Sequence, residues 1–190
     1  MEDQILIETS VRHVHISPEH IEVLFGQGAK LEPRRGLEQP GLFVCKERVD
    51  LVGPKGTIQR VSILGPSRDY TQVELSMTDA YNLGIEAPYR ESGDLENTPG
   101  CTIIGPVGKL VIEHGVIIPW RHIHVNSKDA EKWGISDKDI VSVKVEEDGR
   151  ALIFNDVLAR VHPKVMTFMH IDTDEANAAG IRGRAYGTLV

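Results

Sequence analysis

The sequence predicts a mainly β chain, organised as two pseudo-symmetric β-barrel domains capped by short α-helices. Short β-branched runs alternate with Gly and Pro turns, the helical stretches are brief, and one short sequence recurs in each half of the chain. Short strands at regular spacing with such turns are typical of all-β barrels and sandwiches. The chain has 190 residues, a length that fits one or two ordinary domains.

The individual elements follow from local patterns. Strands are predicted where β-branched residues cluster between turns: 5–7, 49–52, 61–64, 102–104, 110–112, 116–118, 140–145 and 157–161. Short helices are predicted at 18–25, 78–83, 127–133 and 173–179, each followed by a glycine. The first opens with Ser17-Pro18, an N-cap residue followed by Pro at the first helical position. The stretch 86–98 is the most linker-like part of the chain.

Composition excludes several classes of protein. The net charge is −7 and aromatic residues make up 5% of the chain, which argues against a nucleic-acid partner. No apolar run approaches the length of a membrane span, so no membrane partner is expected, and the N-terminus has no secretory signal pattern. Cys45 and Cys101 fit no CxxC pattern, so we expect reduced thiols in a cytoplasmic protein.

An internal repeat is the most informative feature. Arg12-His13-Val14-His15 recurs as Arg121-His122-Ile123-His124, and each copy precedes a capped helix. A second alignment, shifted by 96 residues, matches a segment around Glu74 with one around His170. Two related halves imply a pseudo-symmetric structure with one duplicated site.

The repeated histidines predict metal binding. Residues i and i+2 of a strand face the same side, so His13 and His15 project together, as do His122 and His124. The repeat adds Glu74 to the first pair and His170 to the second. Three ligands with an open fourth position are typical of catalytic zinc, although cobalt, nickel or iron(II) also suit imidazole. The alternative is that duplicated strands hold buried histidines hydrogen-bonded for structural reasons.

Other polar residues leave two interpretations open. Arg68 precedes Glu74 by six residues and could hold a phosphate bidentately beside a metal, or be a solvated turn charge. Arg12 and Arg121 alternate to the opposite strand face, where a salt bridge is as reasonable as a functional role. Lys55, at a turn tip, could meet a nucleotide phosphate or simply be solvated. The histidines without a repeat partner are expected to be surface or structural residues: His20, His114 and His162.

No nucleophile motif is present. The sequence contains neither a P-loop nor a GxSxG elbow, and neither cysteine is followed by a paired histidine pattern. Covalent catalysis through Ser or Cys is therefore not expected.

These segments together resemble the PduL-type phosphate propanoyltransferase family of phosphotransacylases. The resemblance runs from about Ile5 to Ile181. The segments that carry it are Arg12–Ser17, Leu51–Gly56, Ile63–Pro66, Gln72–Glu74, Arg90–Asp94, Arg121–His124 and Met169–Gly180.

The resemblance implies an activity and a domain plan. It implies reversible transfer of a short acyl group, propanoyl or acetyl, between coenzyme A and inorganic phosphate, giving an acyl phosphate. It also implies one β-barrel half at 12–119 and a second at 120–190 that is completed by the N-terminal strand 2–11, with two zinc ions in a shared cleft.

The resemblance also implies roles for named residues. One zinc falls to His13, His15 and Glu74, and the other to His122, His124 and His170. Arg68 falls on the phosphate-binding arginine. The coenzyme A contacts fall on six residues: Thr9, Ser10, Val11, Lys55, Ser62 and Asn177.

The sequence also predicts partners and a location for the protein, and it leaves two alternative functions open. The resemblance implies acyl-coenzyme A and phosphate as partners and an acyl kinase as a pathway neighbour, and it leaves a homodimer open. Because no shell-targeting extension precedes His13, the cytoplasm is expected rather than a bacterial microcompartment. The alternatives are a metal-dependent thioesterase, which would use water in place of phosphate, and a non-catalytic zinc-stabilised barrel, which would have closed four-ligand sites.

Overall fold

The chain divides into two compact units, each with its own hydrophobic core. The computed structural model describes residues 4–146 and 149–190. One unit spans Arg12–Pro119 and is called the sheet unit below. The other joins the residues up to Val11 with Trp120–Val190 and is called the barrel unit. The prediction of a mainly β chain with barrel sheets and short helices is confirmed.

Six strands close into a barrel in the barrel unit. The order around it is β1-β14-β11-β13-β12-β15. The strands span Ile5–Thr9 (β1), His122–Val125 (β11), Ile140–Val145 (β12), Leu152–Val161 (β13), Phe168–Ile171 (β14) and Ala185–Leu189 (β15). Helices α3 (Ser127–Trp133) and α4 (Thr173–Ala178) complete the unit. A closed barrel leaves no unpaired strand edge, so the short β11 and β14 are held on both sides.

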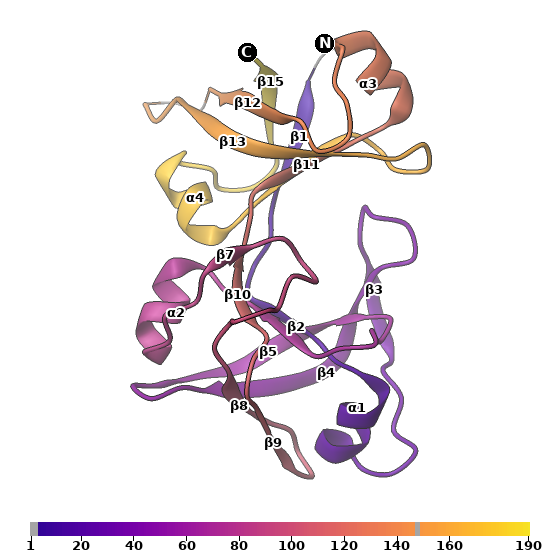
Figure 1. Ribbon diagram of the computed structural model, residues 1–190, viewed down its shortest axis with the longest axis vertical. Coiled ribbons are helices and arrows are strands. Elements are labelled where there is room, and N and C mark those ends of the chain that lie inside the picture. The colour runs from indigo at the N-terminus through magenta and orange to yellow at the C-terminus, as the bar shows by residue number, and fades with distance from the viewer. Residues whose placement is uncertain (1–3, 147–148) are drawn as a thin grey trace. The chain divides into compact units, whose positions relative to one another are not determined.

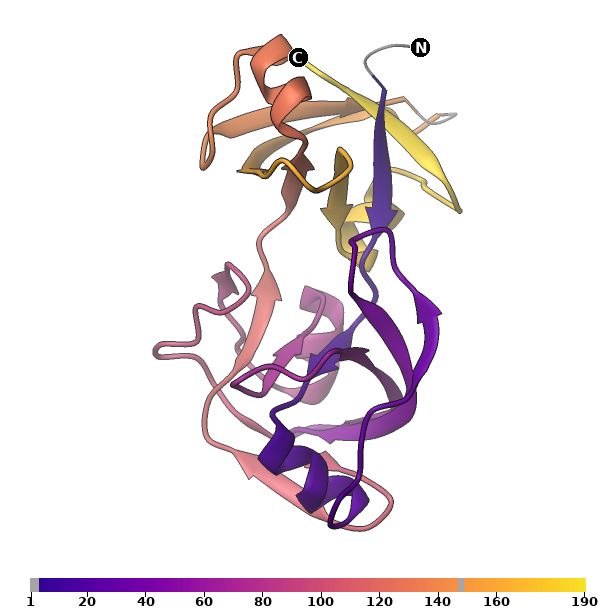
Figure 2. The ribbon, with the colours of Figure 1, turned by 90° about the vertical axis from the view of Figure 1, so that its right-hand side faces the viewer.

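The strand β1 comes from the other end of the chain. It pairs parallel with β14 and antiparallel with β15, and Figure 2 shows this indigo strand among the orange and yellow strands of the barrel unit. Ile5 and Ile7 point into the barrel core and are almost fully buried. Alternation along the strand then places Glu8 on the opposite face, beside His170 in the pairing register.

Nine strands form the curled sheet of the sheet unit. The order is β7-β10-β6-β2-β5-β4-β8-β9, and β3 pairs with β4 (Figure 1). The strands span His13–His15 (β2), Pro33–Gly36 (β3), Phe43–Val52 (β4), Thr57–Gly65 (β5), Gln72–Glu74 (β6), Tyr89–Arg90 (β7), Cys101–Ile104 (β8), Lys109–Ile112 (β9) and Val116–Pro119 (β10). Helices α1 (Pro18–Phe25) and α2 (Met77–Leu83) belong to this unit. The segment interpreted above as linker-like lies inside it, because Tyr89 and Arg90 pair with β10.

The repeat appears as the same local arrangement in both units. The strand β2 lies between β5, to which it is parallel, and β6, to which it is antiparallel. The strand β11 lies in the same way between β13 and β14. Arg60 in β5 and Asp156 in β13 both have positive φ, +57° and +55°, and they are 96 residues apart. The pairing register shifts at both places, between β4 and β5 and between β12 and β13. Each unit therefore has a bulged strand beside its histidine strand.

The helix ends agree with the sequence signals. Ser17 caps α1, Ser76 caps α2, and Asp172 forms a capping box with Glu175 at α4. Asn126 caps α3. Among the described residues, none of the helices has the length and hydrophobicity that crossing a bilayer requires.

Candidate metal centres and anion site

The first cluster forms where two short antiparallel strands of the sheet unit face each other. His13 and His15 lie on one face of β2 with ring centroids 5.0 Å apart. Glu74 of β6 pairs with His13 in the strand register. Its Oε2 lies 3.2 Å from His13 Nε2, and its Oε1 lies 3.8 Å from His15 Nε2. All three side chains are buried.

The second cluster repeats this geometry in the barrel unit. His122 and His124 lie on one face of β11 with ring centroids 4.9 Å apart. His170 of β14 pairs with His122, and its Nδ1 lies 3.3 Å from His122 Nε2. In each cluster the three candidate ligand atoms lie within 4.8 Å of one another.

Burial lowers the pKa of three of these imidazoles, those of His15, His122 and His124, so that they are neutral at physiological pH. Burial, together with the neighbouring His13, lowers the pKa of His15 to about 3. Burial, together with His170, lowers the pKa of His124 to about 4. The pKa of His122 is also well below its usual value, because the ring is buried and lies near the Arg160 guanidinium. A neutral imidazole has a free lone pair, the form in which histidine binds a metal.

Glu74 supplies the only carboxylate in the first cluster. Burial alone would raise its pKa, but His13, His15 and the hydrogen bond from Ser92 hold the pKa well below the ordinary value. Two imidazoles and an ionised carboxylate fit a divalent metal such as zinc, and so do three imidazoles. The donor sets of both clusters therefore suit the metal ions that the sequence predicts.

Arg68 lies beside the first cluster. Its Nη1 donates to Ser92 Oγ at 2.9 Å and to Tyr70 Oη at 3.2 Å, and its guanidinium lies 5.8 Å from the Tyr70 ring centroid. Its charge helps to lower the pKa of His15, as expected of a cation close to that ring. The side chain is half-buried and anchored, not a freely solvated turn residue.

Ser92 and Gln72 belong to the site, although no sequence pattern assigns them a role. The Ser92 hydroxyl donates to Glu74 Oε1 at 2.9 Å and accepts from Arg68 Nη1 and Gln72 Nε2. Gln72 Nε2 also donates to Glu74 Oε1, and Gly93 N donates to Gln72 Oε1. One signal was available, since Gln72 precedes Glu74 by two residues in a strand and so shares its face.

The two arginines beside the histidine pairs form equivalent ion pairs. Arg12 contacts Asp79 of α2 at 2.7 Å, and Arg121 contacts Glu175 of α4 at 3.0 Å. The partners are separated by the same 96 residues that relate Glu74 to His170. Of the two interpretations left open by the sequence, the salt bridge is the one found in both units.

Two of the predicted coenzyme A contacts belong to the sheet unit. Lys55 lies in the turn between β4 and β5, where its backbone N–H donates to Leu83 O at 2.9 Å. Its exposed ammonium lies 5.5 Å from the Tyr81 ring centroid. Ser62 pairs with His13 in the strand register, so it adjoins the first cluster.

The other four belong to the barrel unit. Thr9 ends β1, and Ser10 donates its backbone N–H to Ile171 O at 2.8 Å. Val11 is 54% exposed, and Asn177 is exposed on α4. Thr9 and Ser10 are thereby placed alongside β14, the strand that carries His170.

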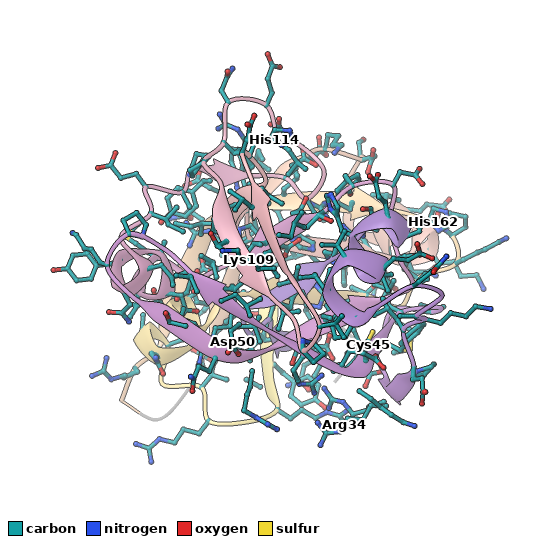
Figure 3. All side chains as sticks on the ribbon, turned by 90° about the horizontal axis from the view of Figure 1, so that it is seen from below. Arg34, Cys45, Asp50, Lys109, His114 and His162 are labelled. Atoms are coloured by element: carbon teal, nitrogen blue, oxygen red, sulfur yellow. The ribbon has the colours of Figure 1, made fainter. Side chains whose placement is uncertain are left out.

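The remaining histidines and the cysteines lie outside the clusters. His114 lies in the turn after β9 and His162 directly after β13, both exposed (Figure 3). His20 Nδ1 lies 2.7 Å from Thr71 Oγ1. Cys45 and Cys101 are buried free thiols, and burial raises their pKa values to about 11 and about 12.

Comparison with known proteins assigns the family. The sequence profile of the phosphate propanoyltransferases matches residues 6–182. A phosphate propanoyltransferase of Thermotoga maritima is 57% identical over 94% of this chain and 85% of its own length. The enzymes of that name from Enterococcus faecalis and Salmonella typhimurium are 50% and 48% identical, over 97% and 90% of this chain and 87% and 81% of theirs. This chain belongs to the phosphate propanoyltransferase family, a family of acyltransferases.

Proposed function

We propose that this chain catalyses the reversible transfer of a short acyl group, propanoyl or acetyl, between coenzyme A and inorganic phosphate. The product is an acyl phosphate and free coenzyme A. The observation that carries the proposal is the anchored Arg68 guanidinium beside a buried His-His-Glu cluster, in a chain of this family. A phosphate clamp beside a metal centre suits phosphate as the acyl acceptor, whereas a thioesterase has no need of one.

We assign one zinc ion to His13, His15 and Glu74 and a second to His122, His124 and His170. When bound, such ions supply Lewis-acid charge that stabilises a thiolate and a developing oxyanion. The protein's part is to present the imidazoles from short strands that are paired on both sides, so that the ligand side chains need little rearrangement on binding.

Arg68 would hold the phosphate. Both Nη1 hydrogens are directed to Ser92 and Tyr70, which fixes the plane of the guanidinium. Within the described residues, Nε and Nη2 make no hydrogen bond, so two parallel donors remain for two phosphate oxygens. Holding the nucleophilic anion in one orientation removes much of the entropic part of the barrier. No acyl-enzyme is needed, so sequential kinetics are expected.

The substrate thioester would be recognised by residues that present backbone and side-chain groups to coenzyme A. We assign this role to Thr9, Ser10, Val11, Lys55, Ser62 and Asn177. Lys55, with an exposed ammonium at a turn tip, is the group suited to a coenzyme A phosphate. We also place the enzyme in the cytoplasm, with an acyl kinase as the neighbour that consumes the acyl phosphate.

Replacement of Arg68 tests the phosphate site. Arg68→Ala should raise the phosphate KM or lower turnover by roughly 30- to 1,000-fold, because a charge-assisted bidentate contact is lost. Arg68→Lys should recover only part of this loss, since an ammonium lacks the planar fork. Coenzyme A release is measured with acetyl-, propanoyl- and butanoyl-coenzyme A, with and without phosphate.

The outcome separates the enzyme from its alternatives. Release of coenzyme A at the same rate without phosphate would identify a thioesterase. An Arg68→Ala variant with unchanged phosphate KM and kcat would remove Arg68 from the anion site. Absence of any turnover in metal-loaded protein would favour the non-catalytic barrel.

Metal content tests the other half of the proposal. Purified protein should carry about two equivalents of zinc or a similar divalent ion, by the ligand count of two three-residue sites. His124→Ala should lose about one equivalent together with activity, since two ligands hold zinc poorly. Elemental analysis that found no transition metal in active protein would contradict the assignment.

A further inference from the structure

Glu8 lies behind His170, on the side of the ring that faces away from the second cluster. The strands β1 and β14 are parallel and place Glu8 beside His170 in register. Glu8 Oε2 lies 3.1 Å from His170 Nε2, while His170 Nδ1 lies 3.3 Å from His122 Nε2. One nitrogen of the ring thus faces a carboxylate and the other faces the cluster.

We propose that Glu8 is a positioning residue for the second metal centre. Its carboxylate accepts the Nε2–H of His170, which leaves the Nδ1 lone pair directed at the metal. A neutral imidazole carries one N–H, so the partner of one nitrogen decides which nitrogen can be a ligand. The inference rests on the metal role proposed above for His122, His124 and His170.

The neighbouring ligand is oriented in the same manner. His122 Nδ1 lies 2.9 Å from the carbonyl oxygen of Trp120, so it donates there and keeps its Nε2 lone pair for the cluster. His122 and His170 therefore both have an acceptor on the outer nitrogen. Their two inner nitrogens are the atoms that approach each other at 3.3 Å.

Comparison of the two units explains why the carboxylate is needed at this position. The repeat relates Glu8 to Ile117, which pairs with Glu74 in the sheet unit. There the third ligand is itself a carboxylate, and its neighbour is apolar. In the barrel unit the third ligand is an imidazole, and its neighbour is the carboxylate. Each centre thus has one carboxylate near the cation that it would hold, as a direct ligand in one and behind the ligand in the other.

The first experiment measures the tautomer of His170 without metal. Long-range ¹H–¹⁵N spectra of histidine-labelled, metal-free protein at about pH 8 distinguish Nε2–H from Nδ1–H imidazole. The wild type should hold His170 in the Nε2–H form, and Glu8→Ala should lose that preference. A wild-type His170 in the Nδ1–H form would overturn the proposal.

The second experiment measures zinc affinity by chelator competition, which resolves the two sites. Glu8→Ala should weaken one site by about 10- to 100-fold, the usual effect of removing an outer-sphere carboxylate, and leave the other unchanged. Glu8→Gln, which keeps an acceptor but loses the charge, should fall between. The matched control is Glu131→Ala, an exposed carboxylate on α3 of the same unit, which should leave both affinities unchanged.

The results separate this inference from the function on which it rests. Wild-type protein with no zinc at His122, His124 and His170 would refute the metal assignment itself. Two normal zinc affinities in both Glu8 variants, with wild-type circular dichroism, would refute only the role of Glu8. If Glu8→Ala fails to fold, two other results would together refute the role of Glu8. These are a normal zinc affinity in Glu8→Gln and a wild-type His170 with no preference for the Nε2–H tautomer.

Discussion

The Ser92 hydroxyl has every hydrogen-bonding position filled. It donates once, to Glu74, and accepts twice, from Arg68 and Gln72. Since Gln72 and Ser92 both donate to Glu74 Oε1, the Oε2 atom is the one that faces His13. This single side chain thus connects the carboxylate of the first cluster with the guanidinium assigned to phosphate.

Ser92→Ala should therefore weaken two properties together. We expect zinc affinity at the first cluster to fall by about 10-fold, because the ligand carboxylate loses an outer partner. We also expect the phosphate KM to rise, because Arg68 loses one of its two anchors. Both are measured on the same preparation, by chelator competition and by initial rates.

Tyr70→Phe is the matched control for Ser92→Ala. It removes the hydroxyl that is the other anchor of Arg68, 3.2 Å from Nη1, and leaves Ser92 and its hydrogen bond to Glu74 in place. It should raise the phosphate KM without changing zinc affinity. Equal effects of the two variants on zinc would show that Ser92 does not act through Glu74.

At the scale of elements, a threonine in each unit ties the third ligand strand to the helix that follows the histidine pair. Thr71 Oγ1 accepts from the backbone N–H of Ser17 at 3.1 Å, and Thr167 Oγ1 accepts from that of Asn126 at 3.0 Å. Ser17 and Asn126 are the N-caps of α1 and α3. Each threonine also contacts a residue in the first turn of the helix, His20 or Asp129.

Removing the Thr71 hydroxyl should destabilise the fold without creating a cavity. Thr71→Val is nearly isosteric but leaves the buried N–H of Ser17 without an acceptor, at a cost of about 1–3 kcal/mol. Urea unfolding of Thr71→Val is compared with that of Thr57→Val, where the threonine is exposed in β5. A Thr71 variant as stable as the Thr57 variant would contradict the role given to this hydrogen bond.

The presence or absence of a local signal explains which elements the sequence predicts and which it misses. The four helices have capping residues before them. Three are followed directly by a glycine at positive φ, and α4 is followed by Ala179 and then by such a glycine, so the helix ends are visible in the sequence. The strands β3, β7 and β15 lack β-branched runs, as Pro33–Gly36 illustrates. They form because a neighbouring strand offers an edge, a condition that no local pattern records.

At the scale of the whole molecule, duplication made the two candidate metal clusters predictable. His13, His15, His122 and His124 share a spacing, and the repeat alignment adds Glu74 and His170. The supporting residues are less visible because they are not duplicated. Phe168 stands where the repeat expects a counterpart of Gln72, and its ring packs on His124 and His170 with centroids 4.7 Å and 5.0 Å away. Glu8 and His170 are 162 residues apart in the sequence. The residues of β1 predict a strand, but they do not show that it pairs beside His170.

The buried histidines should make the stability of the metal-free protein depend on pH. His15 and His124 have folded-state pKa values of about 3 and about 4, and that of His122 is also lowered, whereas all three return to about 6.5 on unfolding. As the pH falls below about 6.5, the unfolded chain binds protons that the folded chain does not. The free energy of unfolding must then decrease, by up to about 1.4 kcal/mol per pH unit for each histidine.

Urea unfolding in the presence of a chelator, between pH 7.5 and 5, measures this slope. The interval lies above the range in which most carboxylates titrate, so the histidines dominate it. His124→Gln removes one of the three groups and should flatten the slope by up to about 1.4 kcal/mol per pH unit, whereas His162→Gln, at an exposed position, should leave it near the wild-type value. Saturating zinc should raise stability most at neutral pH, because protons compete for the same lone pairs in the acid range. A metal-free protein equally stable at pH 7.5 and pH 5 would mean that these rings take up protons in the folded state without cost. The inference that the fold holds His15, His122 and His124 neutral would then have to be abandoned.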